Sequence, residues 1–149
     1  MRNEQLEEVL SVRTPLLSLL TSVLWADGRM AHTQVRALDQ VARVLSADDV
    51  AGRIVRGPRP YDASMFTNLG PASRRLLYAL AVWVALADRR VHRRERELLL
   101  ALASGLDLDP IAVHDIQSLV REVLCDEGVT ADGLSRVTAA LSEDVSRVA

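Results

Sequence analysis

The chain has 149 residues, of which 49% are hydrophobic, 26% charged and 3% aromatic. This composition excludes a disordered chain, and the length suits one domain with a core of its own. Because aromatic residues are scarce, Leu, Val and Ala must fill that core, which favours packed helices over sheets. The longest apolar stretch, residues 76–87, is too short to cross a bilayer, which needs about 20 residues.

The cysteine content and the first residues of the chain indicate the cellular compartment of the protein. Cys125 is the single cysteine, so an internal disulfide is excluded, as is typical of a reducing compartment. The first residues lack the basic and apolar segments of a secretory signal. We therefore expect a cytoplasmic protein, and these features leave a peripheral contact with the inner membrane open.

Charge is unevenly distributed along the chain, whose net charge is −2. Residues 51–100 carry ten Arg and four acidic residues, whereas residues 101–149 carry three Arg and nine acidic residues. A basic middle and an acidic end attract each other, either within one molecule or between two.

Helix signals recur along the chain, and no segment shows the alternation of a convincing strand. Thr14-Pro15 and Asp109-Pro110 each place a capping side chain before a Pro at the first helical position. In chain order we expect helices from Asn3, from Thr14, from Ala31 or His32, over 46–56, over 63–69, from Gly70-Pro71, from His92 to 104, from Asp109 to Cys125 and over 131–147. These signals predict an all-α fold of about seven to nine helices.

Two halves of the chain align when one is shifted by 61 residues. The matched positions include Leu19 with Leu80, Val23 with Val84, Ala26 with Ala87, Asp27 with Asp88, Gln34 with Glu95, Leu38 with Leu99 and Ala42 with Ala103. The shared order of apolar helix, Ala-Asp turn, Gln or Glu and apolar helix predicts a duplicated helical hairpin. We place the copies at about residues 14–56 and 71–125 of a single domain, 1–149, with a C-terminal helix at 131–147.

The turns of the two copies carry a family resemblance. They read Ala26-Asp27-Gly28-Arg29-Met30 and Ala87-Asp88-Arg89-Arg90-Val91, followed by Gln34 and Glu95. Over roughly residues 14–125 the chain resembles the TerB-like tellurite-resistance family and is similar to the N-terminal domain of DjlA co-chaperones. Gln34 stands where that family usually has Glu, and Arg89 where it usually has Gly. The resemblance implies an all-helical fold, no catalysis and a role in stress-response complexes, often close to the membrane.

The acidic residues of the two turns have two interpretations. The resemblance implies a metal site formed by Asp27, Asp88 and Glu95, for a divalent cation such as Ca²⁺, which takes oxygen ligands. The residue pattern equally fits helix termination and capping. In that case Gln34 and Glu95, each at the third position of a helix, reach back to the N-cap N–H, which Gln does as well as Glu.

A dense basic cluster follows the second turn. It consists of Arg89, Arg90, Arg93, Arg94 and Arg96, with His92 among them. Because basic charge at a helix N-terminus opposes the helix dipole, we expect an anionic partner to compensate it. An acidic protein segment or a membrane fits better than nucleic acid, since no aromatic stacking platform accompanies the cluster. The alternative is a solvated helix start with ion pairs such as Arg93 with Glu97.

Common enzyme signatures are absent from the sequence. His32, His92 and His114 lack a metal-binding spacing, Cys125 has no His near it in sequence, and there is no phosphate-binding glycine loop. Trp25 and Trp83 are expected to be packing residues.

We therefore expect a non-enzymatic TerB-like interaction module, with a divalent cation as its candidate ligand, in a bacterial stress-response or envelope-associated complex. The alternative is a metal-free scaffold or adaptor of a bacterial defence or assembly system, which binds an acidic protein or a membrane through the Arg cluster. We also expect self-association, in which the acidic end of the chain binds the Arg cluster of a neighbouring copy.

Overall fold

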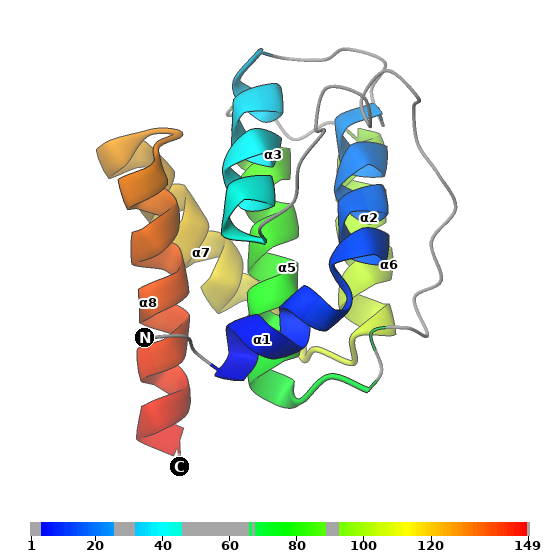
Figure 1. Ribbon diagram of the computed structural model, residues 1–149, viewed down its shortest axis with the longest axis vertical. Coiled ribbons are helices and arrows are strands. Elements are labelled where there is room, and N and C mark those ends of the chain that lie inside the picture. The colour runs from blue at the N-terminus through cyan, green and yellow to red at the C-terminus, as the bar shows by residue number, and fades with distance from the viewer. Residues whose placement is uncertain (1–3, 26–31, 46–65, 67, 89–92, 149) are drawn as a thin grey trace.

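The computed structural model describes residues 4–25, 32–45, 66, 68–88 and 93–148. Within these ranges the chain forms seven helices and no strand, which confirms the all-α prediction (Figure 1). The helices are α1 (Glu4–Ser11), α2 (Arg13–Trp25), α3 (His32–Val44), α5 (Pro71–Leu86), α6 (Arg93–Gly105), α7 (Pro110–Glu127) and α8 (Ala131–Val148). The helix expected over 46–56 lies outside the described residues, as does most of the one expected over 63–69.

Helix α5 is the centre of the fold. Residues 76–87, the longest apolar stretch of the sequence, are all buried. Since a helix that is apolar on every side needs cover on every side, its neighbours must surround it. The other six described helices all contact α5. In Figure 1, α1, α2 and α3 lie toward the viewer, α6 and α7 lie toward the back, and α8 runs alongside.

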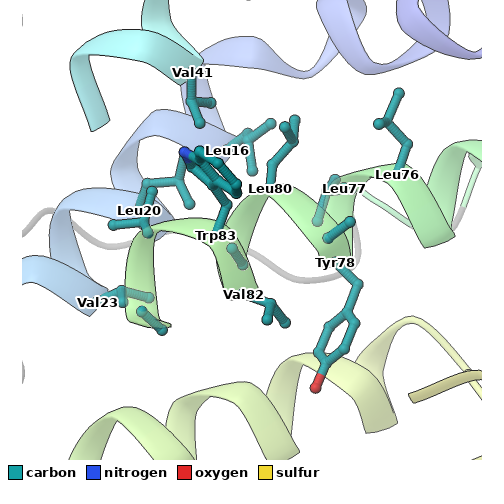
Figure 2. Packing of buried hydrophobic residues seen from close by; sticks show 14 of the residues in the cluster. Leu16, Leu20, Val23, Val41, Leu76, Leu77, Tyr78, Leu80, Val82 and Trp83 are labelled. Carbon is teal, nitrogen blue, oxygen red and sulfur yellow. The ribbon is translucent and has the colours of Figure 1, made fainter. Parts of the chain in front are cut away.

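Two polar atoms of this buried helix each meet a glutamine. Trp83 Nε1 donates to Gln40 Oε1 of α3 at 3.1 Å, and Gln117 Nε2 of α7 donates to the Tyr78 hydroxyl at 2.9 Å. Figure 2 shows Trp83 and Tyr78 leaving α5 on opposite sides. Burial raises the pKa of the Tyr78 hydroxyl above its usual 10.0, against the lowering effect of the bond from Gln117. The two glutamines thus tie α3 and α7 to opposite sides of the central helix.

The helices of the two halves repeat with the offset found in the sequence. α3 and α6 begin and end 61 residues apart, and α2 and α5 end 61 residues apart. The two hairpins are nevertheless covered differently, because α3 packs against α2, α5 and α8, whereas α6 packs mainly against α5. Gln40 of α3 donates to Val129 O, between α7 and α8, at 3.0 Å, while the matching residue Ala101 of α6 is exposed. The other described helices therefore leave an outer face of α6 with little cover.

One predicted helix start is wrong and another is confirmed. Helix α2 begins at Arg13 rather than after a cap at Thr14, because Leu16 N already donates to Val12 O at 3.0 Å. Pro15 still lies in the first turn, where a missing N–H loses no helical bond. At α7 the predicted cap is present, and Asp109 Oδ1 accepts a bond from Ala112 N at 2.8 Å.

The N-terminus of α5 is capped by a side chain from another helix. Gly70 occupies the N-cap position and has no side chain to offer. Glu8 of α1 replaces it: Oε1 accepts from Gly70 N at 3.2 Å and Oε2 accepts from Ser73 Oγ at 2.5 Å. The carboxylate also places negative charge at the positive end of the helix dipole. This contact joins the first helix of the chain to the central one.

We predict that Glu8→Ala lowers the free energy of unfolding by about 1–2 kcal/mol, the usual effect of losing an N-cap. Urea denaturation followed by circular dichroism measures it. The matched control is Glu7→Ala, which removes an exposed carboxylate from the same helix and is expected to change stability by less than about 0.5 kcal/mol. Equal effects of the two substitutions would contradict the capping role.

Candidate functional site

Two of the three residues of the predicted metal site lie in the described part of the chain. Asp27 lies outside the described residues. Asp88 is half-buried just after α5, and Glu95, the third residue of α6, is fully buried. Among the residues that the structure describes, no three His, Cys, Asp or Glu side chains gather into a group able to hold a metal. Because Asp27 is not among them, the shared site stays a prediction.

Gln34 and Glu95, which the 61-residue repeat matches to each other, are in direct contact. Gln34 Nε2 donates to Glu95 Oε2 at 2.9 Å, and also lies 3.4 Å from Ala85 O of α5. Both side chains have 0% exposure. The first turns of α3 and α6 therefore meet in the core through equivalent residues, one an amide and the other an acid.

This contact corrects the capping interpretation of Gln34. A capping box requires the side-chain oxygen of Gln34 to accept the N-cap N–H. Gln34 Oε1 instead has no hydrogen-bond partner, while Nε2 is directed at Glu95 and at α5. The amide is used to supply a donor to a buried acid, because a buried carboxyl group needs hydrogen-bond donors around it.

The basic cluster is divided between the described and the undescribed parts of the chain. Arg89, Arg90 and His92 lie outside the described residues. Arg93 forms the predicted pair with Glu97, at 3.3 Å between Nε and Oε1, and its side chain is 92% exposed. Arg94 and Arg96 are exposed, and no described acidic residue pairs with either. The described part of the cluster is thus three exposed guanidinium groups near the start of α6, with Arg94 and Arg96 on opposite flanks of its outer face.

The remaining candidate residues do not form a site. His32, His114 and Cys125 are all exposed. Trp83 is fully buried, as expected of a packing residue, while Trp25 is 37% exposed. In the described part of the chain, no helix is both long and apolar enough to cross a membrane.

The structure adds two apolar features that the sequence analysis did not identify. Leu100 of α6 is 61% exposed and Ile111 of α7 is 74% exposed. A cavity of about 380 Å³ lies beside Ile111, and its lining includes Arg75, Asp115, Ile116, Leu119 and Leu141. Helical register offered one signal: Leu98, Leu99 and Leu100 are consecutive, and in a helix covered from one side three successive residues cannot all face the core.

No family model, curated protein or solved structure matches the chain. The TerB-like resemblance therefore rests on the two turn motifs alone. Function is inferred below from the described side chains and their surroundings.

We predict strong coupling between Gln34 and Glu95 in a double-mutant cycle. Gln34→Met removes a donor from a buried acid and lowers the free energy of unfolding by about 2–3 kcal/mol. The double variant Gln34→Met with Glu95→Met is expected to lose about 1–3 kcal/mol less free energy of unfolding than the sum of the two single losses, because neither polar group of the pair is left without its partner.

The control cycle combines Gln34→Met with Gln117→Met, whose partners are different side chains. Its effects are expected to add within about 0.5 kcal/mol. Denaturant titrations supply both cycles, and additivity of Gln34 with Glu95 would contradict the proposed contact.

Proposed function

We propose that this protein is a non-enzymatic helical adaptor that binds an acidic segment of a partner protein through the outer face of α6. The observation that carries the proposal is the set of three exposed arginines, Arg93, Arg94 and Arg96, of which only Arg93 pairs with a described acidic residue. We define these three residues and Leu100 as the α6 face.

The chemistry of the α6 face suits carboxylates. Guanidinium groups bind carboxylates through two parallel hydrogen bonds, and Arg sheds its hydration more readily than Lys. Near the start of α6 the arginines oppose the helix dipole, and an acidic partner relieves that repulsion. Exposed Leu100, 61% accessible, adds apolar area of the kind that anchors a protein interface.

The contact between Gln34 and Glu95 supports a metal-free form of the adaptor. A Glu at position 34, as is usual in the TerB-like family, would place two carboxylates at hydrogen-bond distance, where a cation or a proton must separate their charges. Gln34 supplies an N–H at 2.9 Å instead. The amide thus avoids the carboxylate repulsion that a cation would otherwise neutralise. We retain the TerB-like resemblance for the helical scaffold. On this proposal the adaptor serves a stress-response or defence complex in the cytoplasm.

We predict that Arg94→Glu with Arg96→Glu weakens binding of an acidic peptide about tenfold, since each lost exposed pair contributes up to about 1 kcal/mol and each reversed charge repels the peptide. Fluorescence anisotropy with a labelled peptide rich in Glu and Leu, at low ionic strength, measures the affinity. The matched control is Arg36→Glu with Arg43→Glu, two exposed arginines of α3. Equal losses in both variants, or binding of anionic vesicles without binding of the peptide, would overturn the proposal.

A metal titration separates the adaptor from a cation-binding module. We expect millimolar Ca²⁺, Mg²⁺ or Zn²⁺ to leave the Tm of chelator-treated protein unchanged, because a ligand that binds only the folded state raises Tm. A saturable rise in Tm that Asp88→Asn removes would contradict the metal-free form. Arg36→Glu protein is the control for non-specific ion effects.

A further inference from the structure

Helices α6 and α7 are consecutive in the chain, and each carries a strongly exposed large aliphatic side chain. Leu100 is on the second half of α6 and Ile111 is in the first turn of α7, with exposed fractions of 61% and 74%. The connection between the helices, residues 106–109, is held to α5, because Arg74 Nη1 donates to Leu106 O at 3.3 Å. Both helices lie toward the back in the view of Figure 1.

Each of these two apolar side chains has a charged residue four positions away on its own helix, and the two charged residues have opposite signs. Arg96 precedes Leu100 by four residues, and Asp115 follows Ile111 by four. Residues four apart lie on one helix face, about 6 Å apart along the axis. In an antiparallel pair of these helices, a register that places Leu100 on Ile111 also places Arg96 on Asp115. A parallel pair with the same apolar contact separates the two charges.

The cavity beside Ile111 offers space for an incoming apolar side chain. Its volume is about 380 Å³, and Ile111, Ile116 and Leu119 supply apolar walls while Asp115 supplies a carboxylate at the lining. Arg75, on the same lining, has no ion pair with a described residue. The cavity thus carries both signs of charge around an apolar centre.

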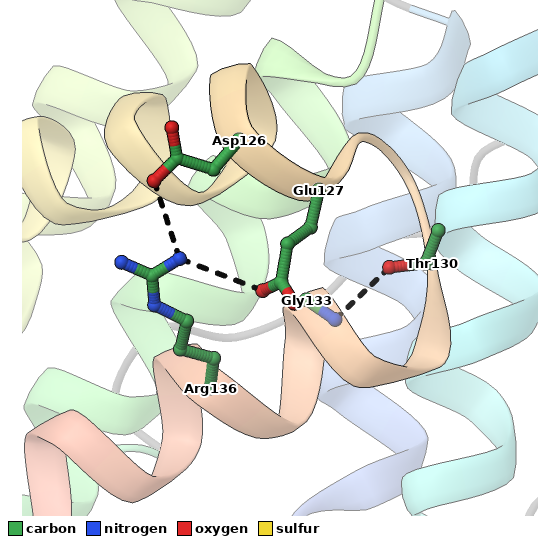
Figure 3. A network of polar contacts seen from close by, with 5 residues as sticks. All are labelled: Asp126, Glu127, Thr130, Gly133 and Arg136. Carbon is green, nitrogen blue, oxygen red and sulfur yellow. Dashed lines mark hydrogen bonds and ion pairs between the residues drawn. The ribbon is translucent and has the colours of Figure 1, made fainter.

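Other acidic groups at the α7–α8 corner are already engaged. Arg136 Nη1 lies 3.3 Å from Asp126 Oδ2 and 3.7 Å from Glu127 Oε2 (Figure 3). Figure 3 also shows Gly133 N donating to Thr130 Oγ1, at 3.0 Å, in the first turn of α8. Asp115 pairs with no described basic residue. It is therefore an acid available to a partner beside the cavity.

We propose that the partner of the α6 face is a second copy of this chain, whose α7 receives α6 in an antiparallel contact of Leu100 with Ile111 and of Arg96 with Asp115. This inference rests on the proposed function, since it takes the α6 face as a protein-binding surface. A two-fold axis that forms one α6–α7 contact between two copies forms its equivalent as well, and it closes the assembly as a dimer.

The test uses the fact that the two-fold contact contains the pair of Arg96 with Asp115 twice. Arg96→Asp alone faces Asp115 of the second copy, and Asp115→Arg alone faces its Arg96, so each single variant meets like charges twice. A mixture of the two variants forms two attractive pairs in a mixed dimer. Sedimentation velocity of the full chain, over protein concentrations from micromolar to millimolar at low salt, measures the association of the wild type, of each variant and of the mixture.

We expect the wild type to dimerise, each single variant to dimerise at least about tenfold more weakly, and the mixture to return to within about threefold of the wild type. Arg43→Asp on α3 is the control and is expected to dimerise like the wild type. Both test positions are exposed, so circular dichroism is expected to show an unchanged fold. A monomeric wild type at every concentration, or a mixture no stronger than its components, would overturn the inference.

The acidic peptide separates this inference from the proposed function. Asp115→Arg leaves the α6 face intact and is expected to bind the peptide at least as well as the wild type. A monomeric wild type that binds the peptide would remove the dimer and leave the adaptor. A monomeric wild type that fails to bind the peptide would remove both.

Discussion

Complete burial of α5 is the constraint on which the rest of the structure depends. Residues 76–87 offer no polar face, so every direction around the helix must be filled by another helix. The two polar tips, on Tyr78 and Trp83, are tolerated because Gln117 and Gln40 bond them from opposite sides. Even Gly133 serves this cover, since a Cβ there would lie 3.0 Å from Trp83 Cη2 and hold α8 away. Each surrounding helix uses one face to cover α5, and only the surface that its other neighbours leave exposed is accessible to a partner.

The two halves of the chain are similar in their helices and different in their cover. Gln40 holds α3 under the α7–α8 turn, while the matching Ala101 of α6 is exposed. The halves meet at Gln34 and Glu95, where an amide next to a carboxyl group avoids the repulsion of two acids. In this interpretation Gln34 supplies a bond within the core, and the arginines of α6 supply the exposed charge. The proposed function is therefore assigned to the outer face of α6 and not to the two Ala-Asp turns.

Much of the scaffold could be predicted from the sequence because its signals are local. Gly70-Pro71 identified the start of α5, and Asp109-Pro110 identified the start of α7. The predictions failed or were incomplete where the partner is distant in sequence. Nothing near Gly70 indicates that Glu8 caps α5, and the spacing of Gln34 fits a local cap equally well as a contact with Glu95. The basic cluster was visible in the sequence, but the exposure of Leu100 and Ile111 depends on which faces α5 and α8 leave uncovered.

Helix α5 is buried by all its described neighbours, whereas they hold α6 mainly from one side. Native-state hydrogen exchange of the dilute protein, resolved by residue, distinguishes the two helices. We expect amides of residues 76–86 to exchange only through global unfolding, and amides in the first half of α6 to exchange through smaller openings with a lower free energy. Local exchange within α5, or equal protection of α5 and α6 in dilute protein, would contradict this expectation.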